Sequence, residues 1–189
     1  MTRNVKRFLA GSLLSLTPAI AFAAPQTAAD FPNLLGERTE YVSLRAESVE
    51  VPVRKGTSTN LVARALQDHL VLNQTGATTY LGISILSDTL VGVYNPYPLP
   101  TGNYGGHRVS APAPTPGAPV INQYYWTDNQ AAPASGRTCL YEVAVSDVGG
   151  SCSAQVAFLS YNGAICTFDA GLSWINLTSC EAQIVWGHQ

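Results

Sequence analysis

The amino-acid sequence predicts a mainly β protein, an antiparallel β-sandwich or meander with one N-terminal α-helix. Short segments of alternating apolar and polar residues recur along the chain, separated by turn residues. Only residues 59–72 carry apolar side chains at helical spacing. The last part of the chain divides at its four cysteines into segments of similar pattern. These three observations favour strands over helices, and residues 24–189 are expected to form one compact domain.

Residues 1–23 have the three parts of a secretory signal peptide. A basic start is followed by a mostly apolar run, Phe8 to Phe22, that is short for a membrane span. The A-x-A motif at Ala21 to Ala23 predicts cleavage after Ala23. A membrane anchor is the alternative, but Gly11 and Pro18 interrupt the apolar run. We therefore expect a secreted or periplasmic protein of bacterial type, with no transmembrane segment in the mature chain.

The charge balance restricts the expected partners. Cleavage would remove three of the ten basic residues and none of the twelve acidic ones, so the mature chain carries a net charge of about −5. A chain with so few cations cannot neutralise a row of phosphates. The sequence therefore argues against nucleic acid as a partner, and no motif in it indicates a cofactor.

Residues 24–95 are predicted to contain strands and the helix. Two short strands are expected around Tyr41 to Leu44 and Val49 to Val53, the second at a sheet edge because Pro52 cannot donate a hydrogen bond. The helix over 59–72 would place His69 on its apolar side as a core histidine, and Arg64 and Asp68 as an outward i,i+4 pair. Two further strands are expected in residues 78–86 and 89–95.

Residues 138–189 are predicted to form a disulfide-bonded antiparallel meander. Each of four segments begins with a cysteine, alternates and ends in turn residues, at a spacing of 13 or 14 residues. Four cysteines in an exported protein are expected to be bonded, and this spacing does not suit zinc. Turns near Gly149, Gly163 and Leu177 favour Cys139 with Cys166 and Cys152 with Cys180. In one flat sheet these pairs would be too far apart, so the strands must fold over or be reordered.

Residues 96–137 are interpreted as a Pro-, Gly- and Tyr-rich crossover loop. The stretch from Tyr94 to Arg137 holds eight of the twelve prolines and five of the nine tyrosines. A long irregular segment in a compact domain is generally functional or a linker. The Pro-rich part, Ala111 to Pro119, has the composition of a semi-rigid spacer.

The aromatic residues of this segment form the candidate ligand site. Aromatic rings beside amides and a carboxylate suit a sugar or a peptide, because rings offer flat apolar area and the polar groups bond to hydroxyls or backbone. The alternative is that the rings fasten the loop to the sheet, or that "QYYW" begins another strand. The candidate ligand-binding residues are Tyr97, Tyr104, His107, Arg108, Tyr124, Tyr125, Trp126 and Asp128.

The search for catalytic motifs finds no nucleophile elbow, zinc-protease motif or phosphate-binding loop. His107, beside Arg108, is the best histidine for chemistry, and a small secreted hydrolase built on it is one alternative. The favoured hypothesis is a non-catalytic exported binding or surface-interaction module that binds carbohydrate or a protein partner. A self-assembling subunit of an extracellular fibre or matrix is the third.

Overall fold

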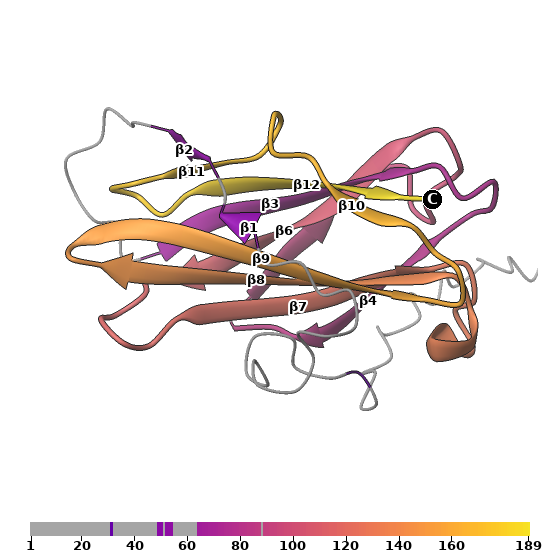
Figure 1. The fold of residues 1–189 in the computed structure, drawn as a ribbon, viewed down its shortest axis with the longest axis horizontal. Helices are drawn as coiled ribbons and strands as arrows, with labels where there is room; N and C mark the ends of the chain where they lie inside the picture. The colour runs from indigo at the N-terminus through magenta and orange to yellow at the C-terminus, as the bar shows by residue number, and fades with distance from the viewer. Residues whose placement is uncertain (1–30, 32–48, 51, 55–63, 88) are drawn as a thin grey trace, which may run out of the picture.

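The protein folds as two β-sheets packed face to face. The structure, a computed structural model, describes residues 31, 49–50, 52–54, 64–87 and 89–189. Two sheets, named A and B here, lie as two layers in Figure 1. These residues form no α-helix and one short 3-10 helix, η1 (Pro133–Ser135). The expected mainly β architecture is confirmed, whereas the signal peptide and the strand around residues 41–44 lie outside the described residues.

Sheet A has five strands, and all of its neighbouring strands are antiparallel. Their order is β1 (Val49–Glu50), β9 (Ser151–Tyr161), β8 (Thr138–Val148), β7 (Val120–Thr127) and β4 (Tyr80–Ile85). Glycines with positive φ, at 149 and 150, allow the tight β8–β9 turn.

Sheet B has seven strands and is mixed. Its order is β2 (Val53–Arg54), β11 (Trp174–Asn176), β12 (Ala182–His188), β3 (Arg64–Asn73), β6 (Tyr104–Pro112) and β5 (Thr89–Val93), and β10 (Cys166–Phe168) also pairs with β12. Strand β12 runs parallel to β3, and β11 runs parallel to β2. The expectation of a purely antiparallel fold is therefore wrong for sheet B, where the C-terminal strand inserts beside β3. The edge position expected at Pro52 is confirmed, because β1 and β2 on either side of it end the two sheets.

One core lies between the sheets and contains residues of both. Tyr141 of β8 stacks on Trp186 of β12, with ring centroids 4.5 Å apart, and its hydroxyl donates to the carbonyl of Gly187. Tyr124 of β7 lies beside Tyr141, with a centroid distance of 5.7 Å. All three aromatic side chains are buried, so much of the contact between the layers is aromatic.

Both disulfides cross from sheet A to the strands of sheet B. Cys139 of β8 is bonded to Cys166 of β10, and Cys152 of β9 to Cys180, which precedes β12; the Cα atoms lie 5.6 and 5.3 Å apart. The predicted pairing is confirmed, and so is the condition that the strands fold over. The meander prediction holds only for β8 and β9, because the chain leaves sheet A after β9.

The helix predicted over residues 59–72 is wrong for residues 64–72, which lie in β3; residues 59–63 lie outside the described residues. Strand β3 alternates strictly between inward and outward side chains. The sequence hides this alternation, because polar Gln67 and His69 point inward while Leu66 and Leu70 point outward. Hydrogen bonding to β6 on one side and to β12 on the other overrides the local helical spacing.

The interpretation of residues 96–137 as a loop is also wrong, because β6 and β7 lie within them. The Pro-rich residues 113–119 carry the chain from sheet B to sheet A. In the link from β5 to β6, Leu99 is completely buried and exchanges two backbone hydrogen bonds with Thr79. This link therefore closes one end of the core.

We predict that Gly106→Ala destabilises the fold by at least about 2 kcal/mol. Gly106 of β6 has a φ of +151°, and a Cβ atom there would lie 2.1 Å from the carbonyl oxygen of His69. Gly92 of β5 is the control, because a Cβ atom there meets nothing within 4 Å. Its replacement by Ala should change the free energy of unfolding by no more than about 0.5 kcal/mol. Urea unfolding of the oxidised proteins measures both values, and equal losses would contradict the prediction.

Candidate binding face

The outer faces of the two sheets differ in exposure. On sheet A, Gln123, Tyr125 and Glu142 point away from the core and are nevertheless buried, and Phe31 lies on this face with its ring centroid 4.9 Å from that of Tyr125. On sheet B, by contrast, outward-pointing Tyr104 is 51% exposed. The outer face of sheet B is accessible at β3 and β6, where Leu66 is also 42% exposed, and it is covered at β12, where Val185 is 2% exposed. We take the accessible part of this face as the candidate site.

The sheet register places particular side chains together on this face. Across β3 and β6, Asp68 is paired with Arg108 and Leu72 with Tyr104. On the other side of β3, Gln183 of β12 is the neighbour of Asp68. We use the name sheet B face for the outward side chains of Leu66, Asp68, Leu70, Leu72, Tyr104, Arg108, Ser110 and Gln183, together with Tyr94.

An ion pair lies at the centre of the sheet B face. Arg108 contacts Asp68 through two bonds, Nε to Oδ1 at 2.6 Å and Nη2 to Oδ2 at 2.8 Å. The hydroxyl of Tyr94, just after β5, donates to the same Oδ1 atom, and the guanidinium lies 5.8 Å from the Tyr94 ring centroid. The geometry is bidentate and supported by a third side chain, so both charged groups have fixed orientations.

The electrostatics of this triad keep Asp68 ionised. Burial alone would raise the pKa of Asp68, but hydrogen bonds from Arg108 and Tyr94 and the positive charge of Arg108 lower it below its usual value. Burial and the hydrogen bond to Asp68 raise the pKa of Tyr94. At neutral pH the face thus presents a carboxylate, a guanidinium and a neutral phenol.

Tyr104 begins β6 and is the most exposed aromatic residue of the described chain. It is four residues from Arg108 on the same face of one strand, which corresponds to about 13 Å along the sheet. A ligand that contacts both side chains must therefore be extended along β6.

Three predicted site residues lie in the core instead. His107, Tyr124 and Trp126 are at most 1% exposed. The Tyr124 hydroxyl accepts a hydrogen bond from Trp186 Nε1 and can donate its own hydrogen to His69 Nδ1, 3.1 Å away. The rings of His69 and His107 stack with centroids 4.9 Å apart. The expectation that His69 is a core histidine is confirmed, whereas His107 is no more accessible than His69.

Two more predicted residues lie away from the sheet B face. Tyr125 points to the outer side of sheet A and is 3% exposed. Tyr97, 38% exposed, lies in the link before β6. Its ring is T-shaped to that of Trp126, and its hydroxyl lies 3.5 Å from the carbonyl of Leu81. The eight predicted residues therefore do not form one surface. Only Tyr104 and Arg108 lie on the sheet B face.

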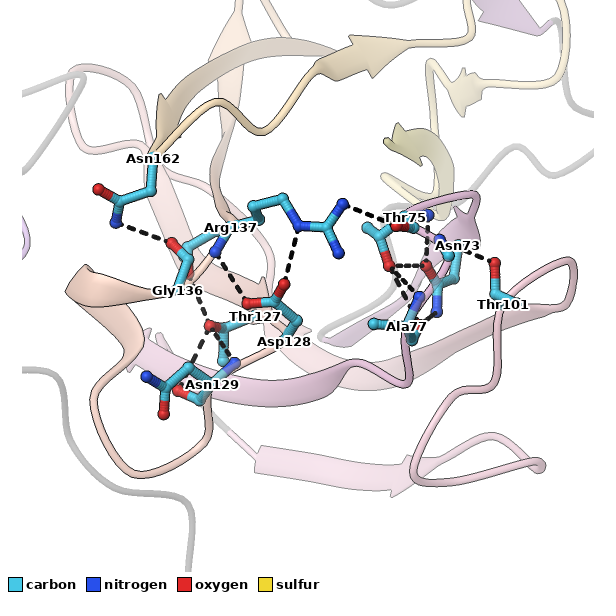
Figure 2. A network of polar contacts seen from close by, with 12 residues as sticks. Asn73, Thr75, Ala77, Thr101, Thr127, Asp128, Asn129, Gly136, Arg137 and Asn162 are labelled. Carbon is cyan, nitrogen blue, oxygen red and sulfur yellow. Dashed lines mark hydrogen bonds and ion pairs between the residues drawn. The ribbon is translucent and has the colours of Figure 1, made fainter.

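Asp128 belongs to a polar network that joins loops at one end of the sandwich (Figure 2). Its carboxylate accepts hydrogen bonds from the backbone N–H and the Nε of Arg137, the latter at 2.9 Å. Arg137 extends further and donates from Nη1 to the carbonyl of Thr75 at 2.7 Å. Asp128 thus fastens the β7–β8 loop to the β3–β4 loop, a structural use of a residue predicted to bind ligand.

The sequence interpretation missed Asp68, Tyr94 and Gln183. A helix would pair Asp68 with Arg64. In strand β3, Arg64 instead donates a hydrogen bond to Ser110. Asp68 accepts one from Arg108. To place Asp68 and Arg108 on one outer face, residues 64–73 and 104–112 must both be read as strands and paired in the observed register. Nothing local in the sequence indicates the contact of Tyr94 with Asp68.

No group of three or more His, Cys, Asp or Glu residues within the described ranges could hold a metal ion. Those ranges also contain no helix with the length and apolar character needed to cross a membrane. No protein-family model, curated protein or solved structure matches the chain.

We predict a steep loss of stability in acid, caused by the three buried histidines. Burial lowers the pKa of His69 to about 3 and that of His188 to about 4, and it lowers the pKa of His107 well below 6.5. Each of these three histidines becomes protonated near pH 6.5 in the unfolded chain but only at lower pH in the folded chain. Stability is therefore fully present above that pH and is lost as the pH falls toward the folded-state values, by up to about 1.4 kcal/mol per pH unit for each histidine.

Urea unfolding at a series of pH values between 7 and about 4.5 measures this slope. In His107→Asn the slope should decrease by about 1.4 kcal/mol per pH unit, whatever the variant does to stability at pH 7. An unchanged slope would show that His107 takes up its proton in the folded state too.

Proposed function

We propose that the protein is an exported, non-catalytic module that binds an oligosaccharide on the sheet B face. The observation that carries this proposal is an exposed aromatic ring, Tyr104, in line with the fixed ion pair of Asp68 and Arg108 on an open sheet. The side chains of Tyr124, Tyr125 and Trp126 are buried, so this face supports ligand binding better than the predicted aromatic loops do.

The chemistry of the face suits a sugar chain. The ring of Tyr104 offers a flat apolar surface to the C–H groups of a sugar at low entropic cost. Asp68 and Arg108 offer an acceptor and donors to hydroxyl groups, and their mutual bonds hold them in place before the ligand arrives. The distance of about 13 Å along β6 exceeds one sugar ring, which favours an oligosaccharide over a monosaccharide.

The disulfides support export. Cys139–Cys166 and Cys152–Cys180 fit an oxidising compartment, either the periplasm or the extracellular medium. Together with the signal-peptide pattern of residues 1–23, they favour secretion and cleavage after Ala23.

A hydrolase receives less support from the structure. Its proposed base, His107, is 1% exposed and stacked on His69 in the core, out of reach of a substrate on the surface. We therefore keep binding without turnover as the proposed activity.

A glycan array probed with the oxidised protein tests the proposal. We expect binding to one class of oligosaccharide, and we expect Tyr104→Ala to weaken it about tenfold because the stacking surface is lost. Arg108→Lys should also weaken it, since lysine cannot keep the bidentate contact with Asp68. Release of reducing sugar, followed in parallel, reveals any turnover.

Tyr97→Ala is the matched control. It removes the same ring from an exposed position in the preceding link, away from the sheet B face. Its affinity should remain within about twofold of the parent, with circular dichroism confirming that each variant is folded. Loss of binding in Tyr97→Ala but not in Tyr104→Ala would show that the ligand binds near the link between β5 and β6, and it would contradict binding on the sheet B face.

A further inference from the structure

His188 is a buried histidine whose ring makes no hydrogen bond. It is the last residue of β12 and is 0% exposed. Neither of its ring nitrogens has a hydrogen-bond partner within the described part of the chain. Buried polar groups are normally paired, and each unpaired one calls for an explanation. This imidazole gains no hydrogen bond in return for its burial, so we looked for a role in its surroundings.

His188 adjoins the polar network of Asp128 and Arg137. We use the name loop end for the end of the sandwich formed by the β3–β4 loop, residues 74–79, and the β7–β8 loop, residues 128–137. The backbone carbonyl of His188 accepts a hydrogen bond from the amide of Gln74 at 2.7 Å. Figure 2 shows Arg137 reaching from Asp128 to Thr75, the residue after Gln74. The side chain of Arg137 thus closes the loop end beside His188.

Two charged groups of the described chain act on the imidazole, Asp128 and Arg137. Its neighbours in the sheet, Asn73 on β3 and the disulfide-bonded Cys166 on β10, carry no charge. Burial lowers the pKa of His188 to about 4, although the carbonyl of Arg137 and the carboxylate of Asp128 favour the protonated ring. The guanidinium of Arg137 disfavours it. The ring is therefore neutral at neutral pH.

We propose that His188 is an acid-sensitive latch, whose protonation separates Arg137 from Asp128 and opens the loop end while the two sheets stay packed. An imidazolium at this position repels the guanidinium of Arg137 and attracts the carboxylate of Asp128, so it weakens the contact between them. Opening also gives the ring access to water, where a histidine takes up its proton near pH 6.5. Opening of the loop end is therefore coupled to uptake of one proton.

The disulfide between Cys139 and Cys166 confines the opening. Cys139 lies two residues after Arg137, and Cys166 is the register partner of His188. The bond therefore holds β8 beside β10 while the side chains of the network separate. This opening is local, unlike the unfolding of the whole chain in acid, to which all three buried histidines contribute.

Hydrogen exchange of the oxidised protein at a series of pH values from 7 to 4 tests the proposal. The backbone amide of Arg137 donates to Asp128 Oδ1 at 2.8 Å and reports whether the latch is closed. The closed state is fully stable above pH 6.5 and loses stability as the pH falls toward about 4. The protection factor of this amide should fall by up to about tenfold per pH unit in that range, and amides in the middle of β8 should stay protected.

Gly150 provides the matched control at the other end of β8. Its amide donates to Asp147 Oδ1 at 2.7 Å in the β8–β9 turn, so it has the same kind of acceptor as the amide of Arg137. Protonation of the aspartates themselves would reduce the protection of both amides. An equal fall at Gly150 and Arg137 would therefore overturn the proposal, whereas a fall confined to Arg137 supports it.

His188→Gln removes the titrating group. The amide of Arg137 should then lose its pH dependence between pH 6.5 and 4, whatever the substitution does to its protection at pH 7. His188→Asn is a second variant without a titrating ring, for use if the first does not fold. Protection at Arg137 that does not change with pH in the parent protein, or that changes equally in the parent and the variant, would overturn the proposal.

Discussion

The packing of sheet A against sheet B is the contact on which the rest of the structure depends. Trp186 lies at its centre, stacked on Tyr141 and hydrogen-bonded to Tyr124. Strands β7, β8 and β9 follow one another along the chain and form the middle of sheet A, with β4 and β1 at its edges, and sheet B joins strands from both ends of the described chain. Strand β12 pairs with β3, which is far from it in the sequence. The two disulfides tie β8 and β9 of sheet A to the C-terminal segments of sheet B, and they limit how far these segments separate in the unfolded chain.

The core between the sheets also contains polar side chains, among them Gln67, His69 and His107. Gln67 accepts a hydrogen bond from Asn122 across the two layers at 3.0 Å, and His69 is bonded to Tyr124. Buried polar groups are tolerated when they are paired and then favour one arrangement of the strands. In the described part of the chain, however, His69 Nε2 and His107 Nδ1 have no partner. Burial lowers the pKa values of His69 and of His107, the histidine that the sequence favoured for chemistry, so both are neutral inside the fold.

Short-range sequence patterns predicted β8, β9 and the disulfide pairing, and they failed where strand pairing depends on residues that are distant in the sequence. Alternation located β8 and β9. The expected turns near Gly149, Gly163 and Leu177 favoured the two cysteine pairs that the structure contains. Strand β3 could not be recognised, because its inward side carries Gln67 and His69 while leucines face out. Its identity as a strand depends on β6 and β12, which are far away in the sequence.

The candidate site could not be predicted from the sequence either, because it also depends on pairing between strands that are distant in the sequence. The cluster of aromatic residues at 124–126 suggests a binding loop in the sequence. These residues lie in a strand, however, where neighbouring side chains point to opposite faces. Tyr124 and Trp126 therefore point into the core, and Tyr125 points to the outer side of sheet A. The sheet B face is assembled across strands, from Asp68 on β3 and Arg108 on β6. Because both lie on central, hydrogen-bonded strands, binding there requires little ordering of the protein. A rigid sheet face therefore suits recognition of an extended, repetitive ligand better than the loops that the composition indicated.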